Sequence, residues 1–563
     1  MTHKLFLLLP LLFAFGHKEI DTNYSQRAGK VPATACYFET SDTSLQRLYN
    51  VAEEKAAKNV RKFSDQFTVL VEGAEYGNVW IETQPMGGAM YAKRNVLIAR
   101  NNQLIFMDRQ REDGKIPSMI GPISDYQYVK HLPFLDLSKD SLYFQFWGSI
   151  QGYNFPEPAL EVYFLLNKDT AYLTKLYKCL ELFDAFLWRT RDSDNNGCLE
   201  AWCTTDNGED QSIRFKGAPD LWANDFAPTG KNLPPDINPE KSMVPYESMD
   251  MMAYSYSGRK VLAEISAIKG NGKTNYWYAK AKEVKDKMSQ FLWRPEKHAY
   301  YDRDKNNEFL PTLIHNSLRT MNFGTMSQEM ADDFIKFHLL NPDEFWTPMP
   351  LPSIAANDPL FQNSTMNNWS GQPQGLTYQR AIKALENYGH FAEVTLIGHK
   401  LLDKTARTLK FTQQFDPFTG EQNGGDGYGP TILSVLEYIS RMYGVNISKD
   451  TVSWNGLALP GNKYSYTQKW GDKTFNLNQE NDKVRCSINA TPLFTCTAGV
   501  KIVTDLKGKV IELAVIDTVP IPLVLAMRGK IYKALIKPNE VYYLKNEKLV
   551  LKKKVPFDYP YRK

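Results

Sequence analysis

The segment from Asp192 to Ser212 combines acidic side chains, a tryptophan and turn-forming residues. Its acids are Asp192, Asp194, Glu200, Asp206, Glu209 and Asp210. Carboxyl groups beside an aromatic ring suit sugar chemistry, because an acid can protonate a glycosidic oxygen while the flat ring holds one face of a pyranose. A solvated turn or a calcium loop would use the same residue types, so the rest of the chain has to distinguish these alternatives.

The start of this segment has part of the pattern of a calcium-binding loop. Asp192, Asp194 and Asn196 precede Gly197, as in D-x-[DN]-x-[DN]-G, but position 12 of the loop is Cys203 instead of glutamate. Because that ligand is missing, we interpret the segment as a turn and expect neither a metal site nor another cofactor.

The composition is that of a globular protein with additional aromatic residues. Of the 563 residues, 43% are hydrophobic, 23% are charged and 13% are aromatic. The net charge is only +4 and the basic residues are dispersed, so we expect no nucleic-acid partner. The length predicts a large core and more than one domain.

The N-terminus has the features of an export signal. Lys4 precedes an apolar run from Leu5 to Phe15 that is too short to span a bilayer. We therefore predict a signal peptide at residues 1–18, followed by an N-terminal extension at 19–42. The expected location is periplasmic or secreted, without membrane insertion.

Apolar periodicity predicts a helical domain over residues 43–444, as in Leu173, Leu176, Leu180, Phe183 and Leu187. Further helices are predicted at 250–268, 274–292, 327–338, 374–388, 391–405 and 429–442. Residues suited to capping precede several helices: Asp42, Asp169 and Asn275. Long loops rich in Gly, Pro and Trp alternate with short turns. This pattern favours an α/α toroid, in which loops at one mouth build the site, over a regular solenoid.

The pattern changes to that of β-strands after about residue 445. Strands are predicted at Lys483–Ile488, Gly499–Val503, Lys509–Val515 and Ile531–Ile536. We therefore predict a small β-sandwich domain at 445–563, with a supporting role.

A series of motifs runs in order through residues 70 to 443. They include Q-R-E-D-G-K-I-P (110–117), G-E-D-Q-S (208–212), L-W-R-P-E-K-H-A-Y-Y-D (292–302), N-W-S-G-Q-P (368–373) and F-D-P-F-T-G-E (415–421). Their order and spacing resemble the inverting glycosidases of glycoside hydrolase family 63 and the related mannosylglycerate hydrolases. This resemblance implies a mainly α fold, an (α/α)6 toroid of the six-hairpin type with the small C-terminal β-sandwich.

The resemblance places the general acid at Asp210, the aspartate of G-E-D-Q-S. Partial desolvation would raise its pKa and keep it protonated until it donates to the leaving oxygen. Asp206, four residues earlier, is the alternative donor. An ordinary capping or turn aspartate is the alternative without chemistry.

The second carboxylate departs from the family pattern. The family's general base is a glutamate two residues before F-D-P, and Gln413 stands there in this chain. A glutamine cannot accept a proton from water at any useful pH. Glu421 is the first candidate to replace it and Asp426 the second, because both lie in the same loop. Other carboxylates near the predicted mouth are Glu72, Glu75 and Glu82.

Further side chains of the loops are expected to hold the sugar. The segment W-I-E-T-Q-P (80–85) stands where relatives tend to show a Trp and an Asp that bind the terminal sugar. The predicted substrate-binding residues are Trp80, Glu82, Gln84, Trp202, Trp346, Trp369, Gln372, Gln413 and Asp426.

The leading hypothesis is an exported, exo-acting glycoside hydrolase that acts on α-linked glycosides or oligosaccharides with inversion. Its two carboxyl groups should lie roughly 6.5–9.5 Å apart, which leaves room for the attacking water. One alternative is a glycan-binding protein that has lost its base. The other is a rhamnosidase, or an enzyme acting on uronic acids by hydrolysis or elimination, on the same toroid.

Overall fold

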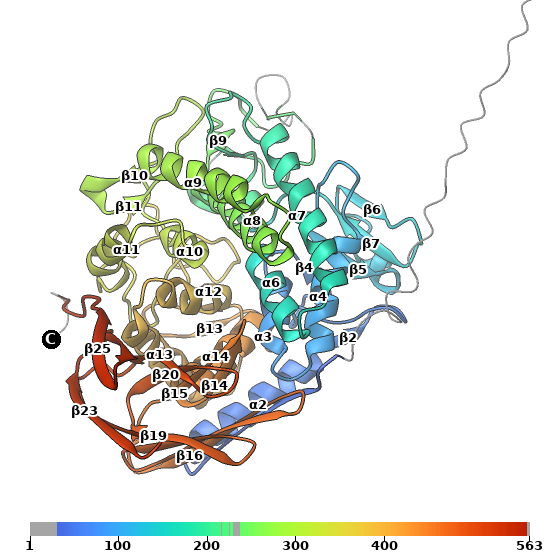
Figure 1. Ribbon diagram of the computed structural model, residues 1–563. Helices are drawn as coiled ribbons and strands as arrows, with labels where there is room; N and C mark the ends of the chain where they lie inside the picture. Colours follow the sequence, from blue (N-terminus) through green and yellow to red (C-terminus); the bar gives the residue numbers. More distant parts are fainter. Residues whose placement is uncertain (1–30, 216, 225, 229–232, 234–236, 560–563) are drawn as a thin grey trace, which may run out of the picture.

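The computed structural model describes residues 31–559 except 216, 225, 229–232 and 234–236 (Figure 1). The predicted signal peptide at 1–18 lies outside the described residues. A helical barrel is followed in the chain by a β-rich C-terminal region. The expectation of a mainly α chain is therefore only partly correct, because two large sheets stand beside the barrel.

Within the described residues, six helices form a closed inner ring in which each helix packs on the next and the last packs on the first. Around the ring they are α3 (Gln84–Tyr91), α6 (Pro156–Leu165), α8 (Met249–Lys269), α10 (Asn316–Phe323), α12 (Gly375–Glu386) and α14 (Gly429–Tyr443). Because ring neighbours follow one another in the chain, the connections within the barrel are local.

The outer helices alternate with the inner ones along the chain. They are α2 (Thr43–Lys58), α4 (Val96–Asp108), α7 (Thr170–Thr190), α9 (Thr274–Phe291), α11 (Gln328–Phe334) and α13 (Phe391–Thr408). The described chain also contains a short helix, α5 (Tyr126–Val129), and a π-helical turn after α11 (Ile335–Leu339). This alternation is that of the predicted α/α toroid.

Local capping explains where some of these helices begin. The Asp42 side chain accepts from the backbone N–H groups of the first turn of α2, and Asp169 does the same for α7. The predicted cap Asn275 is wrong, because α9 begins at Thr274 and places Asn275 inside the helix.

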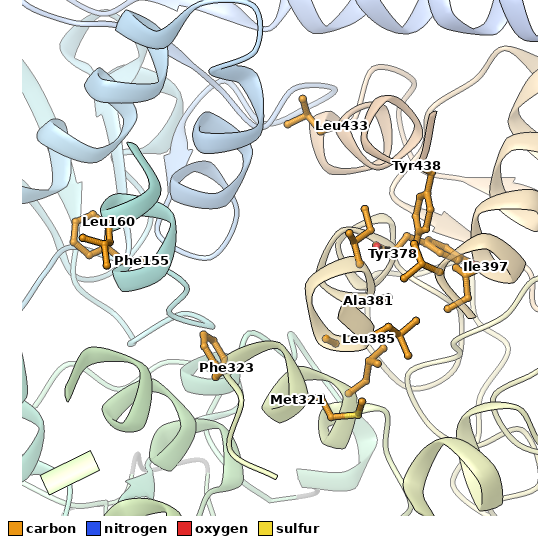
Figure 2. Close-up of a cluster of buried hydrophobic side chains, with 14 of the residues drawn as sticks. Phe155, Leu160, Met321, Phe323, Tyr378, Ala381, Leu385, Ile397, Leu433 and Tyr438 are labelled. Carbon is orange, nitrogen blue, oxygen red and sulfur yellow. Dashed lines mark hydrogen bonds between the residues drawn. The ribbon is translucent and has the colours of Figure 1, made fainter. Parts of the chain in front are cut away.

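Apolar side chains fill the space between the two rings. Figure 2 shows Tyr378 and Leu385 of α12 lying near Ile397 of α13 and Tyr438 of α14. All four are buried, and the Tyr438 hydroxyl donates to the Tyr378 carbonyl, so its one polar group is satisfied in the core. This packing keeps the inner helices rigid under the site loops.

In the described part of the chain, five small sheets lie in the loops between the barrel helices. A four-stranded sheet has the order β4 (Val79–Trp80), β5 (Met119–Pro122), β7 (Tyr143–Phe146) and β6 (Leu135–Leu137). The two-stranded pairs are β2 (Val60–Lys62) with β3 (Thr68–Leu70), β8 (Glu200–Ala201) with β9 (Tyr246–Glu247), β10 (Trp293–Arg294) with β11 (Ala299–Tyr300), and β12 (Gln414–Phe415) with β13 (Gln422–Asn423).

The C-terminal region is a sandwich of two antiparallel sheets. The six-stranded sheet has the order β14 (Val445–Ser448), β15 (Thr451–Gly456), β20 (Val500–Asp505), β21 (Val510–Val515), β24 (Val541–Lys545) and β25 (Lys548–Lys553). The seven-stranded sheet has the order β1 (Thr34–Thr40), β16 (Lys463–Trp470), β17 (Lys473–Glu480), β18 (Lys483–Ile488), β19 (Thr491–Thr497), β22 (Ile521–Met527) and β23 (Lys530–Ile536). Trp454 of the first sheet contacts Phe475 and Phe494 of the second, which places the sandwich core between them.

The strand β1 comes from the segment predicted as an N-terminal extension. It pairs antiparallel with β16 from Thr34 opposite Trp470 to Thr40 opposite Tyr464, and so forms one edge of the seven-stranded sheet. The chain then enters the barrel through α2. No described helix combines the length and the apolar character needed to cross a bilayer.

Candidate active site

The site lies where the chain enters the inner helices. Each inner helix is preceded by a loop that contributes polar side chains: Glu72, Tyr76 and Glu82 before α3, Gln151 before α6, Glu209 and Asp210 before α8, His315 before α10, Asn367 and Trp369 before α12, and Gln413 and Tyr428 before α14. Helix N-termini carry partial positive charge, which suits a site rich in carboxylates.

The loop between α7 and α8 is held in place by buried ion pairs. Asp206 pairs with Arg191 at 2.8 Å and also accepts from the Ile150 backbone N–H at 2.8 Å. Glu209 pairs with Arg214 at 2.7 Å. These contacts fix Asp206 and Glu209, the two acids that precede Asp210 in the loop. Among the described residues, Asp210 itself has no cationic partner.

Asp206 is therefore corrected from alternative donor to structural anchor. Its side chain is fully buried, and besides the ion pair with Arg191 it accepts from the Trp202 backbone N–H at 2.8 Å. Both oxygens of this carboxylate are occupied by a guanidinium and two backbone N–H groups, so neither is available to contact a substrate.

Asp210 has a different environment. Its two oxygens accept from neutral amides, Gln151 Nε2 at 3.5 Å and Asn367 Nδ2 at 3.2 Å. Burial raises the pKa of Asp210, and these two hydrogen bonds oppose the rise only in part. A half-buried carboxyl group with a raised pKa is what a proton donor requires.

Glu82 lies close to Asp210 in a tight enclosure. Two glycines with left-handed backbones, Gly152 at φ +55° and Gly208 at φ +66°, face its carboxylate so closely that a Cβ on either would come within 2.5 and 2.3 Å of Glu82 Oε1. Arg380 Nη2 lies 3.1 Å from the same oxygen. Burial raises the pKa of Glu82 to about 7, while Arg380 lowers it and the Asp210 charge raises it further.

Glu72 is the third buried carboxylate of the cluster. It follows the strand β3 and accepts from the Tyr428 hydroxyl at 2.9 Å. Burial raises the pKa of Glu72 to about 8, and the charges of Glu82 and Asp210 contribute in the same direction. Burial is the largest cause of the raised pKa at each of the three carboxyl groups, so all three favour the protonated form more than exposed carboxyl groups do.

Gln413 lies beside this carboxylate cluster, which we define as Glu72, Glu82 and Asp210. Its Oε1 accepts from the Tyr76 hydroxyl at 3.1 Å. Burial raises the pKa of Tyr76 above its usual range, and Glu72 and Asp210 add to the rise, which places this phenol within the field of both acids. Tyr76 thus links Gln413 to the region of Glu72 and Asp210.

The two predicted replacement bases do not join the cluster. Glu421 is exposed at the turn between β12 and β13. Asp426 pairs with Lys55 at 2.5 Å and accepts from the Phe411 backbone N–H, and Lys55 lowers the pKa of this carboxylate. Both assignments are therefore corrected, because one side chain points to solvent and the other is already neutralised.

The predicted aromatic platforms divide into two groups. Trp202 is fully buried, with the Arg191 guanidinium 4.0 Å from its ring centre and its Nε1 donating to Glu200, so it packs the acid loop and cannot stack on a sugar. Trp346 is half-buried under Lys400. Trp369 is also buried, 3% exposed, and stacks on His315 with ring centres 5.9 Å apart. Trp80 is half-buried and packs edge-on against Phe146.

Two predicted substrate-binding amides are also engaged within the protein. Gln84 Oε1 accepts from the Trp80 backbone N–H at 3.0 Å. Gln372 donates to Asn363 Oδ1 at 2.9 Å and accepts from Asn423 Nδ2 at 3.0 Å. Both side chains are buried, so they shape the loops instead of presenting free amides.

Sequence reasoning did not single out several residues of the site: Tyr76, Gln151, Asn367, Arg380 and Tyr428. Four of these, all except Arg380, come from loops far apart in the chain and meet only through closure of the ring. Arg380 is a buried cation on the second turn of α12, and an arginine amid apolar helix positions was the available signal.

The opposite mouth of the ring holds a separate cavity of about 460 Å³ between the barrel and the sandwich. Its walls carry paired charges, such as Lys93 with Glu437 at 2.6 Å and Lys501 with Glu386 at 3.1 Å. Cations near the C-terminal ends of the inner helices interact favourably with the partial negative charge there. The charged pairs of this cavity therefore have a structural role.

A comparison with known families gives a match over most of the barrel. Residues 92–431, more than half of the chain, match the model of the mannosylglycerate hydrolase MGH1-like glycoside hydrolase domain. The chain belongs to this family of glycoside hydrolases. The resemblance to family 63 enzymes is thereby confirmed, and so is the prediction of a glycoside hydrolase.

Several solved structures have a fold similar to that of this glycoside hydrolase. A GH63 mannosylglycerate hydrolase from Thermus thermophilus is 18% identical, with a TM-score of 0.54 over 69% of this chain and 99% of that one. A sialidase gives a TM-score of 0.59 at 12% identity, over 84% of this chain and 42% of its own. A GH78 rhamnosidase from a Bacillus species gives 0.52 at 9% identity, over 80% and 41%. At these identities the likeness concerns the fold. A sequence comparison with curated proteins finds no match.

Proposed function

We propose that this glycoside hydrolase removes a terminal α-linked sugar with inversion, using Asp210 as the proton donor. The observation that supports this role most directly is the environment of Asp210. It is bound by two neutral amides and flanked in the loop by two acids that each have their own arginine. Of the three carboxyl groups in this turn, only Asp210 is free to carry a proton to a leaving oxygen.

For the second role we propose Glu72 as the carboxylate that activates water. The family position of the base is occupied by Gln413, and Tyr76 links that amide to the region of Glu72. In this arrangement Gln413 and Tyr76 orient the water, while Glu72 takes its proton. Because burial raises the pKa of Glu72 to about 8, Glu72 acts as the base only in the fraction of molecules in which it is ionised, and Asp210 must keep its proton in that fraction.

Exo action is supported by the enclosure of the cluster. Glu72 and Glu82 are both buried, and Gly152 and Gly208 close directly over Glu82. Such a closed end suits a chain terminus better than the middle of a polymer. In this proposal Glu82 and Trp80 bind the terminal sugar.

The substrates to test first follow from the similar structures. The Thermus enzyme is a mannosylglycerate hydrolase whose crystal structures contain glucose or D-glycerate. We therefore propose a panel of mannosylglycerate, α-linked glucose and mannose disaccharides, and the matching α-glycosyl fluorides.

The test compares Asp210→Asn with Glu72→Gln and Glu72→Ala. Loss of general acid catalysis should lower kcat about 10²–10⁴-fold on disaccharides, but much less on glycosyl fluorides, whose leaving group needs little protonation. Loss of the base should impair both substrate types, and azide should rescue Glu72→Ala by forming a glycosyl azide of inverted configuration. The exposed Glu75→Gln, in the same loop as Glu72, is the control and should retain activity.

Two outcomes would contradict these assignments. If Asp210→Asn loses equal activity on fluorides and disaccharides, Asp210 is not the donor. If wild-type protein binds the sugars in calorimetry and releases none, Gln413 has made the barrel a glycan-binding protein without hydrolysis.

A second candidate is a glycoside that carries a carboxylate, such as a uronic acid. Arg380 Nε and Nη1 are buried and have no hydrogen-bond partner among the described residues, although Arg380 lies against Glu82. Buried N–H groups of this kind suit a substrate carboxylate. A hydrolase that prefers uronides over neutral glycosides, with the preference lost in Arg380→Met, would support it, and an unsaturated product absorbing in the ultraviolet would indicate elimination.

A further inference from the structure

A second group of carboxylates lies in the acidic segment, apart from the carboxylate cluster. Glu200 of β8 stands opposite Glu247 of β9 in the two-stranded sheet. One oxygen each from Asp194, Glu200 and Glu247 can be chosen so that all three lie within 4.8 Å of one another. Glu200 and Glu247 are buried, while Asp194 is exposed and keeps the group open to solvent.

The chain around this group has the register of a calcium loop. Counting from Asp192 as position 1, Asp194 and Asn196 occupy positions 3 and 5, and Glu200 occupies position 9. The bidentate glutamate of position 12 is missing, since Cys203 stands there. Folding supplies a glutamate from elsewhere, because β9 brings Glu247 against Glu200 from a segment nearly fifty residues further along the chain.

Glu247 also points independently to a missing ligand. The residue is 4% exposed, and its Oε2 is buried without a hydrogen-bond partner among the described residues. Its Oε1 accepts from Asn196 Nδ2 at 2.5 Å, and the weakly donating thiol of Cys198 lies beside the carboxylate. A buried carboxylate oxygen left unsatisfied in this way carries a large free-energy cost.

No cationic side chain in the described ranges forms a salt bridge with Asp194, Glu200 or Glu247. Asp194 and Glu247 are each bound by a neutral donor, the Asn196 amide, whose Nδ2 lies 2.8 Å from Asp194 Oδ2 and 2.5 Å from Glu247 Oε1. Glu200 is bound only by the neutral donors Ser193 Oγ and Trp202 Nε1. A divalent cation would neutralise all three acids at once.

We propose that Asp194, Glu200 and Glu247 bind a structural Ca²⁺ ion. All the available ligand atoms are oxygens, and carboxylates from a loop and a neighbouring strand match the flexible coordination of Ca²⁺. The ion would join the turn at 192–197 to the pair β8–β9. Ser248, next to Glu247, donates to Asn207 Oδ1 at 3.0 Å, so the site borders the loop that carries Asp210.

Direct binding is the first test. Full-length protein is treated with EDTA, desalted and titrated with CaCl₂ or MgCl₂ in a calorimeter. We expect one Ca²⁺ per chain and at least tenfold weaker binding of Mg²⁺. Tb³⁺ should bind with luminescence sensitised by Trp202, whose indole N–H contacts Glu200. Absence of Ca²⁺ binding at millimolar concentration, or tighter binding of Mg²⁺, would overturn the proposal.

The variant Glu247→Gln separates a metal site from a merely structural cluster. Without calcium it should melt at the same temperature as wild type or higher, because it removes one of three repelling charges. With CaCl₂ at about a hundred times the Kd found by calorimetry, the wild type should gain about 2.7 kcal/mol and melt roughly 2 °C higher, and the variant should not change. Asp194→Asn, on the exposed side, should weaken Ca²⁺ binding at least tenfold without affecting folding, and Glu240→Gln, exposed in the preceding segment, is the control. Equal calcium stabilisation of wild type and Glu247→Gln would refute the assignment.

Discussion

The buried carboxylate Glu72 predicts an unusual dependence of stability on pH. An unfolded glutamate ionises near 4.5, whereas folded Glu72 keeps its proton up to about 8. Between these values the folded chain holds more protons than the unfolded chain, so this residue makes the folded state less stable as pH rises. Glu72→Gln removes the titrating group while its amide can still accept from Tyr428.

The magnitude follows from the two pKa values. A tenfold difference in proton affinity corresponds to about 1.4 kcal/mol. A rise from 4.5 to about 8 therefore costs the wild type on the order of 5 kcal/mol at pH 9, relative to pH 4. With an unfolding entropy of roughly 2.1 cal/mol/K per residue, a cooperative transition of the whole chain would shift by roughly 4 °C.

The assay is thermal denaturation of wild type and Glu72→Gln from pH 5 to pH 9, followed by tryptophan fluorescence. The difference in Tm should be near zero at pH 5 and should grow in favour of the variant as pH rises. The control Glu75→Gln, whose side chain is exposed in the same loop, should show no such trend. A constant difference across the whole range would refute the reasoning, because it would mean that Glu72 ionises in the folded chain as it does in the unfolded one.

Three further outcomes are expected. Asp206→Asn leaves Arg191 without its carboxylate and should lower the free energy of unfolding by about 3–5 kcal/mol in urea denaturation; an unchanged midpoint would contradict the anchoring role. Gly208→Ala should lower kcat/KM at least tenfold because its Cβ would meet Glu82, whereas Gly270→Ala, with the same left-handed backbone and open space, should not. If residues 1–18 direct export, N-terminal sequencing of protein recovered from the periplasm or medium should begin after them; a full-length N-terminus there would contradict cleavage.

Much of the barrel could be predicted because its helices are strongly periodic. The predicted helix at 250–268 corresponds to Met249–Lys269, and that at 429–442 to Gly429–Tyr443. Helices α3, α4 and α10 were not predicted. Helices α3 and α10 have only eight residues each, and α4 buries Asn101, Asn102 and Gln103, so none of the three offers a long amphipathic stripe.

The site was predictable where residues share a loop and unpredictable where distant loops meet. Asp210 could be chosen from its motif, but the arginine that neutralises Asp206 lies fifteen residues earlier and is not marked by any pattern. Glu421 and Asp426 were reasonable bases by proximity in sequence to Gln413. Ring closure instead brings the loop before α3 against the loop before α14, so Tyr76 contacts Gln413 and Glu72 contacts Tyr428 across more than 300 residues of sequence.

The pairing of β1 with β16 has a consequence for how the chain is made. The first described strand emerges from the ribosome before the barrel, yet its partner at Lys463–Trp470 is synthesised more than 420 residues later. Synthesis at ≈ 5–20 residues per second leaves β1 without its partner for roughly twenty to ninety seconds. During that time an unpaired strand edge is exposed to aggregation and to chaperones. The sandwich can therefore be completed only after the barrel that separates its strands has emerged.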